Sequence, residues 1–134
     1  MLRESANRLT ALIVGACFLI IGALGFTVST AFSFDHPVGA MLFGVVAVNS
    51  LQNVVHLGLG AVLVAVALVG RTPARLATRL IGTLLLLFGI AGLFISSTEI
   101  NIFAVNAAAN LIHFASAATL LAVGLGTDRS PARP

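Results

Sequence analysis

Four long stretches without a charged residue dominate this sequence. They are Leu9–Phe34, Pro37–Gly70, Leu80–Thr98 and Ile100–Thr127. A helix needs about 20 apolar residues to cross the hydrocarbon core of a bilayer, and each stretch is long enough. Only 8% of the residues are charged, whereas soluble domains carry about 25%. The sequence therefore predicts an all-α integral membrane protein, folded as a four-helix bundle.

The arginines set the orientation of these helices. None lies in the first or third loop, where Asp35 and Glu99 stand instead. The seven arginines precede the first helix, separate the second from the third, and follow the fourth: Arg3, Arg8, Arg71, Arg75, Arg79, Arg129 and Arg133. By the positive-inside rule, both termini and the middle loop face the cytoplasm of a bacterial inner (plasma) membrane. This distribution accounts for the net charge of +3 without a nucleic-acid partner.

The middle loop leads to an expectation about lipid. Arg71, Arg75 and Arg79 are spaced four residues apart, so they line one face of a helix at its cytoplasmic end. We expect them to contact anionic lipid headgroups, at about 1 kcal/mol each, or to act as topology determinants alone.

The chain contains one helical hairpin twice. The pattern Ala-Val-Asn-x-x-x-Asn-x-x-His at residues 47–56 returns at residues 104–113, shifted by 57 positions. In each preceding helix three glycines repeat with a shift of 67, and small residues of this kind allow close helix packing: Gly15, Gly22 and Gly25, then Gly82, Gly89 and Gly92. Because each repeat has an even number of spans, both copies enter the membrane in the same direction. We predict one domain, residues 1–126, made of parallel-repeat hairpins at about 8–70 and 75–126, and a disordered cytoplasmic tail, 127–134.

Each repeat places two asparagines and one histidine on one helix face. They are spaced i, i+4, i+7: Asn49, Asn53 and His56, then Asn106, Asn110 and His113. Polar groups avoid lipid, so both faces should turn inward and approach each other. If the first asparagine of each set is an N-cap, each histidine lies about 10 Å below the outer edge of its helix. If the helices begin earlier, the histidines approach the midplane.

Three functions remain open for this polar core. The first is an interhelical hydrogen-bond network in a non-enzymatic structural or accessory membrane component. The second is a haem or metal site in which His56 and His113 are the two ligands. The third is a proton or small-solute pathway, which in so thin a bundle requires a homo-oligomer. No phosphate-binding loop, metalloprotease motif or nucleophile beside an acid–base partner is present in the sequence, so we expect no enzyme and no other cofactor.

Three local features give further expectations. Asp35-His36-Pro37 is typical of a helix cap and first turn, which predicts an interfacial or re-entrant helix over Val38–Val48. Thr72-Pro73 predicts the N-cap and first turn of the third helix. Cys17, the only cysteine, is expected to be a small buried apolar residue.

The motifs Asn53-x-x-His56-Leu57 and Asn110-x-x-His113 resemble those of a family of small four-helix membrane proteins. The family is common in actinobacteria and is catalogued as a domain of unknown function. The resemblance covers roughly residues 8–125, including the hairpin order and the glycine-rich first helix. It implies the same four-helix fold and a membrane location, and it carries no catalytic role. Where the family usually has an acidic or polar residue immediately before the second motif, this chain has Ala109.

Overall fold

Four long helices make up most of the computed structural model, which describes residues 5–34 and 37–127. They are α1 (Ala6–Val28), α2 (Ser50–Val69), α3 (Arg71–Ile95) and α4 (Ala107–Gly126). Each is long and apolar enough to cross a bilayer, and the only sheet in the described ranges is one small hairpin. The prediction of an all-α, multi-pass membrane bundle is confirmed.

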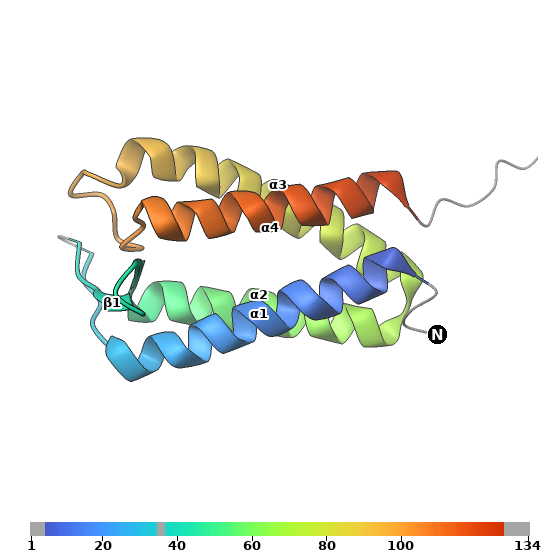
Figure 1. The fold of residues 1–134 in the computed structure, drawn as a ribbon, viewed down its shortest axis with the longest axis horizontal. Helices are drawn as coiled ribbons and strands as arrows, with labels where there is room; N and C mark the ends of the chain where they lie inside the picture. Colours follow the sequence, from blue (N-terminus) through green and yellow to red (C-terminus); the bar gives the residue numbers. More distant parts are fainter. Residues whose placement is uncertain (1–4, 35–36, 128–134) are drawn as a thin grey trace, which may run out of the picture.

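The helices pack as two hairpins that lie side by side (Figure 1). α1 packs along α2, and α3 packs along α4. In the first pair the backbones touch, because a Cβ built on Gly15 or Gly60 would lie 2.9 or 2.7 Å from the carbonyl oxygen of the other glycine. In the second pair Gly89 makes room for the ring of Phe114. The repeated glycines therefore set how closely each hairpin closes.

The start of α1 and the end of α4 lie at the same end of the bundle, on the right in Figure 1. There Nδ2 of Asn7 donates to Oγ1 of Thr127 at 3.1 Å, and Oγ1 of Thr78 donates to Oδ1 of Asn7 at 2.7 Å. A chain with four spans returns to the side on which it began, so this contact agrees with the predicted hairpin order. The predicted tail lies almost wholly outside the described residues.

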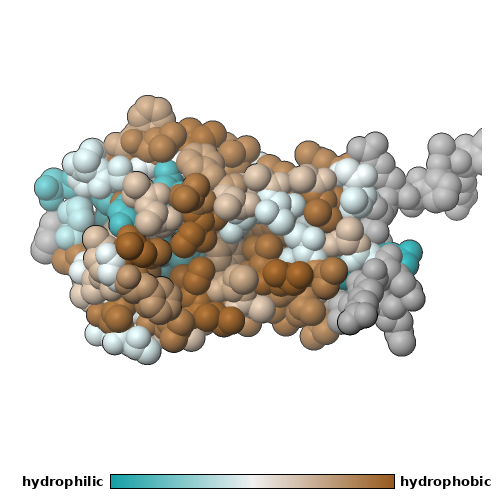
Figure 2. All heavy atoms as spheres, in the orientation of Figure 1, coloured by the Kyte–Doolittle hydropathy of each residue, from teal (hydrophilic) through white to brown (hydrophobic). Residues whose placement is uncertain are grey.

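Hydrophobic side chains cover the outside of the helices. Figure 2 shows them along the length of one face, with hydrophilic residues gathered mainly at the end that carries the loops α1–α2 and α3–α4. Cys17 also lies on the exposed surface, so the prediction that it is buried is wrong. The reason is that α1 turns the face with Gly15, Phe18 and Gly22 toward its neighbours, which points Cys17 away from them.

The segment before α2 is a β-hairpin, and the prediction of a helix over Val38–Val48 is wrong. Strands β1 (Ala40–Leu42) and β2 (Val46–Val48) pair antiparallel. Phe43 and Gly44, between them, have φ values of 54° and 74°. Positive φ at both central positions is the type I′ turn, whose twist suits a hairpin and which no right-handed helix accommodates.

A single residue, Gly70, joins α2 to α3. Arg71 and Thr72 are already helical, and no side chain caps the start of α3, so the prediction of an N-cap at Thr72 is wrong. Pro73 still lies in the first turn, where its missing N–H is not needed. The tight connection leaves Arg71, Arg75 and Arg79 inside the first turns of α3.

Candidate functional site

Asn49 and Asn106 cap the N-termini of α2 and α4. Their Oδ1 atoms accept hydrogen bonds from the backbone N–H groups of Gln52 and Ala109, both at 2.9 Å. Of the two depths left open by the sequence, the structure therefore has the shallower one. His56 and His113 lie two helical turns inside their helices, about 10 Å from the outer helix ends.

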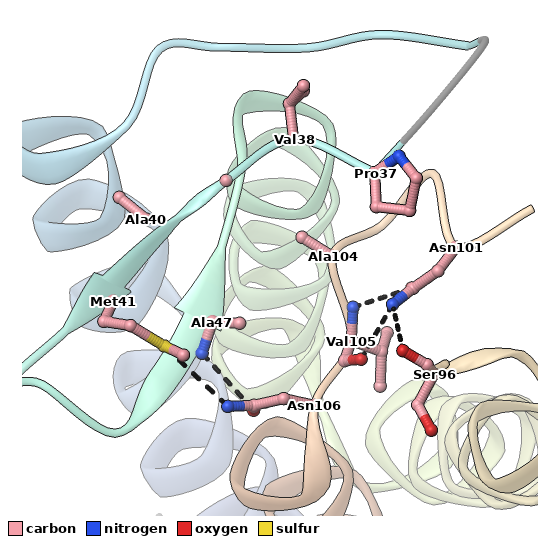
Figure 3. Close-up of a pocket in the computed structure, with 11 residues that line it drawn as sticks. Pro37, Val38, Ala40, Met41, Ala47, Ser96, Asn101, Ala104, Val105 and Asn106 are labelled. Carbon is pink, nitrogen blue, oxygen red and sulfur yellow. Dashed lines mark hydrogen bonds between the residues drawn. The ribbon is translucent and has the colours of Figure 1, made fainter. Parts of the chain in front are cut away.

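The same two asparagines bind each other's loops. Nδ2 of Asn49 donates to the carbonyl oxygen of Ile102 at 2.7 Å, and Nδ2 of Asn106 donates to that of Val45 at 2.8 Å. Val45 and Ile102 are themselves related by the shift of 57, so each cap asparagine binds the equivalent carbonyl in the other repeat. Oδ1 of Asn106 also accepts from the N–H of Ala47 at 3.3 Å (Figure 3). We call these reciprocal bonds of Asn49 and Asn106 the outer clamp.

Asn53 and Asn110, one turn further in, bind the helix that precedes their own. Nδ2 of Asn53 donates to the carbonyl oxygen of Ser29, just past the end of α1, at 3.2 Å. Nδ2 of Asn110 donates to the carbonyl oxygen of Gly89 in α3 at 2.9 Å. The Oδ1 atoms of both are buried without a partner among the described residues. Each inner asparagine thus ties the two helices of its own hairpin together.

The two histidines meet in the middle of the bundle. Their ring centroids are 5.9 Å apart, and His56 and His113 are only 4% and 2% exposed. Aromatic rings pack against both, since Phe18 stacks on His56 at 5.2 Å and Phe88 meets His113 edge-on at 5.0 Å. The inward approach of the two helix faces is therefore present in the structure.

The histidines do not take part in the asparagine contacts. Within the described ranges, neither ring nitrogen of His56 nor Nδ1 of His113 has a hydrogen-bond partner. A buried polar group without a partner costs about 1–3 kcal/mol. The polar core thus consists of four asparagines, which hydrogen-bond to other segments, and two histidines, which form no hydrogen bond with the described residues.

A pocket of about 250 Å³ opens beside the histidines. We call it the α2–α3 pocket, because its lining comes from α2, α3, the α3–α4 loop and one residue of α4: Gln52, Val55, His56, Leu59, Leu84, Leu85, Phe88, Phe103 and His113. Gln52 closes its outer end. With its amide nitrogen turned toward them, Gln52 donates to the carbonyl oxygens of Ala47 and Phe103, both at 3.0 Å.

A second pocket of about 250 Å³ lies at the outer end, between the β-hairpin and the α3–α4 loop (Figure 3). Asn101 organises its floor. Nδ2 of Asn101 donates to the carbonyl oxygens of Ser96 and Val105, and its Oδ1 accepts from the N–H of Val105. Asn101 was missed by the sequence reasoning because it has no counterpart in the first repeat. Its amide is fully engaged in shaping the loop.

Arginines cap the opposite ends of α2 and α4, which the sequence reasoning also missed. Nε of Arg8 donates to the carbonyl oxygen of Ala67 at 2.7 Å, and Nε of Arg79 donates to that of Gly124 at 2.8 Å. Nε of Arg75 is 3.4 Å from the same oxygen of Gly124. The repeat contained the signal, because Arg8 corresponds to Arg75 and Ala67 to Gly124 under the shifts of 67 and 57. Contact of Arg71, Arg75 and Arg79 with lipid headgroups stays a prediction.

Comparison with known proteins places the chain in a family. No curated protein and no solved structure matches it. The family model described as Domain of unknown function (DUF4383) matches residues 8–126, which include all of α2, α3 and α4, nearly all of α1, both inner asparagines and both histidines. The chain therefore belongs to the DUF4383 family of domains of unknown function.

Proposed function

We propose that this protein is a non-enzymatic structural or accessory component of a bacterial plasma membrane. The outer clamp carries this proposal, because its two asparagines hold the two hairpins and their loops in one arrangement. Membrane hydrogen bonds contribute about 0.6 kcal/mol each on average, so their main effect is to specify how helices pair. Because the pairing of its helices is fixed, the bundle presents a constant surface to other membrane proteins.

The arginine distribution supports an orientation with both termini and the α2–α3 connection at the cytoplasmic face. The described arginines all lie at the end of the bundle where α1 begins and α4 ends. At that end we expect Arg71, Arg75 and Arg79 to attract anionic lipids. Partners at the exposed helix faces are proposed to be lipid, further copies of the chain, or other subunits of a membrane complex.

Haem binding is the second candidate, because two imidazoles whose ring centroids are 5.9 Å apart, and which have no hydrogen-bond partner among the described residues, could serve as the two axial ligands. Haem also brings two carboxylates, which need cationic or polar partners when buried. The nine residues of the α2–α3 pocket include no arginine or lysine, and its volume of about 250 Å³ is small for a macrocycle. The lining thus fits haem poorly.

Conduction through a single bundle has less support. Between the histidines and the arginine-rich end, apolar side chains fill the centre of the bundle. They include Leu63, Ala67, Leu85 and Leu120. Protons and polar solutes need hydrogen-bonding groups or water along their path. An oligomer would have to supply such a path between its subunits.

Native mass spectrometry of the tagged protein, isolated from its host membrane in mild detergent, tests the proposal. We expect the bare chain, multiples of it, or a stoichiometric complex with other membrane polypeptides. A variant with both His56→Leu and His113→Leu should give the same species, because the asparagines hold the fold. A stoichiometric haem or metal adduct that is lost in this variant would contradict the proposal and make the protein a cofactor binder.

A further inference from the structure

We propose that the α2–α3 pocket binds the head of a neutral lipophilic molecule through a hydroxyl or carbonyl oxygen. The molecule would enter sideways from the lipid phase, and its oxygen would bind His56 and His113. This ligand site goes beyond the structural role proposed above, which rests on the asparagines and holds whether or not the pocket is filled.

The two histidines provide the recognition of oxygen. A neutral imidazole has one N–H donor and one nitrogen that accepts. Both rings line the pocket and are almost completely buried, and three of their four nitrogens have no partner within the described ranges. A centroid separation of 5.9 Å is short enough for one oxygen atom to hydrogen-bond to both rings. Such an oxygen would remove the cost of leaving these groups unsatisfied.

The charge of the surroundings selects a neutral head. No lining residue is charged, and the described arginines lie at the far end of the helices. A carboxylate or phosphate buried at this depth would have no counter-charge, and a buried unpaired charge is very costly. A hydroxyl or carbonyl group carries no such penalty once it is hydrogen-bonded.

The rim of the pocket gives access from the lipid. Val55 on α2 and Leu84 on α3 both line it, and their side chains are 39% and 59% exposed on the surface that faces acyl chains. Apart from Gln52 and the two histidines, its lining is apolar, including Leu59, Phe88 and Phe103. Ligand pockets usually measure about 300–1,000 Å³, so a pocket of about 250 Å³ holds a head and the start of a tail. The rest of the tail would stay among the lipids.

Histidine ¹⁵N NMR with matched twelve-carbon probes tests the site directly. The chain contains three histidines, so spectra of protein labelled on histidine and held in lipid nanodiscs are simple, and His56→Ala and His113→Ala assign the signals. We expect 1-dodecanol or 2-dodecanone to shift the ring ¹⁵N signals of His56 and His113 in a saturable way. Dodecane should leave these signals unchanged, and dodecanoate should bind at least about fivefold more weakly.

Two tryptophan variants locate the binding. Leu84→Trp narrows the rim of the pocket, whereas Leu80→Trp adds the same side chain one turn earlier, at a position with 56% exposure that does not line it. We expect Leu84→Trp to weaken binding of the oxygen probe by about fivefold or more, and Leu80→Trp to leave it unchanged.

Three results would overturn the proposal: equal shifts with dodecane, equal effects of the two tryptophan variants, or no shift with either oxygen probe in well-folded protein. None of these results would affect the outcome of the native mass measurement. Failure of the ligand site is therefore distinguishable from failure of the structural role.

Discussion

Gly25 and Gly92 are the residues that make room for the two inner asparagines. A Cβ built on Gly25 would lie 2.5 Å from Cγ of Asn53, and one built on Gly92 would lie 2.6 Å from Oδ1 of Asn110. These carboxamides are buried and hydrogen-bonded to backbone carbonyls, so they are not free to move aside. Glycine at each position thus allows the asparagine side chain of one helix to pack against the backbone of the preceding helix.

Substitution Gly25→Ala should lower the free energy of unfolding by about 1–3 kcal/mol, the usual cost of overpacking. Gly58→Ala is the control, because a Cβ at Gly58 would meet no atom within 4 Å. That change should be neutral, or stabilise α2 by up to about 1 kcal/mol through helix propensity. Reversible unfolding in mixed micelles measures both variants.

A double-mutant cycle identifies the cause. In an Asn53→Ala background the obstructing carboxamide is gone, so Gly25→Ala should then cost much less than it does in the wild type. An equal cost in both backgrounds would show that something other than Asn53 opposes the added methyl group.

The spacing of the polar residues predicted their burial, but it left their partners open. Residues at i, i+4 and i+7 share a helix face whatever surrounds them, so the inward placement of Asn49, Asn53 and His56 followed from the sequence. The carbonyl oxygens to which Asn49 and Asn53 donate, those of Ile102 and Ser29, lie in segments outside the helices. The path of such segments depends on turns whose backbone angles are not visible in a hydrophobic pattern. For this reason the division between bonded asparagines and unpartnered histidines emerged only from the structure.

At the scale of the helices, arginine side chains bind the carbonyl groups at the C-terminal ends of α2 and α4. The last carbonyl groups of a helix have no partner within it, and a cation near them also interacts favourably with the helix dipole. Arg8 serves α2, while Arg75 and Arg79 serve α4. In each repeat the first helix therefore secures the end of the second.

Hydrogen exchange should show that Arg8 stabilises the end of α2 and that Arg79 stabilises the end of α4. Arg8→Gln removes the donor to Ala67, so the amides in the last turn of α2, residues 66–69, should exchange faster than in the wild type. The last turn of α4, residues 123–126, should be unaffected. Arg79→Gln should give the opposite pattern, and each variant thus controls for the other. Equal acceleration at both ends in either variant would mean that these arginines act through overall stability.

The β-hairpin shows the limit of reading elements from composition. An apolar run from Val38 to Val48, after a Pro, is compatible with either a helix or short strands, since periodicity alone does not decide in so short a segment. The turn at Phe43 and Gly44 decides it. Gly44 was the available signal, because glycine is favoured where φ is positive. The long helices needed no such local information, since each uncharged stretch contains most of one helix, although the exact ends of the helices differ from those of the stretches.

At the scale of the whole molecule, two copies of a hairpin share one centre. The outer clamp joins the repeats at one end, Asn7, Thr78 and Thr127 join three helices at the other, and apolar packing fills the space between. The α1–α2 loop is longer than the α3–α4 loop by the difference between the shifts of 57 and 67, and it contains β1 and β2. The symmetry is therefore broken at the two loops, beside the outer pocket, and at the other end, where Asn7, Thr78 and Thr127 have no matching residues in the other repeat.

Labelling of single cysteines should establish the orientation of this bundle in the membrane. In a Cys17→Ser background, Glu99→Cys places a thiol in the exposed α3–α4 loop, and Thr72→Cys places one at the exposed start of α3. If arginines hold the start of α3 in the cytoplasm, an impermeant maleimide added to intact spheroplasts should label Glu99→Cys alone. Thr72→Cys should react only after the membrane is opened. Labelling of Thr72→Cys in intact spheroplasts would show that the topology is opposite to the predicted one. The α2–α3 pocket, which lies nearer the Glu99 end, would then open into the cytoplasmic leaflet.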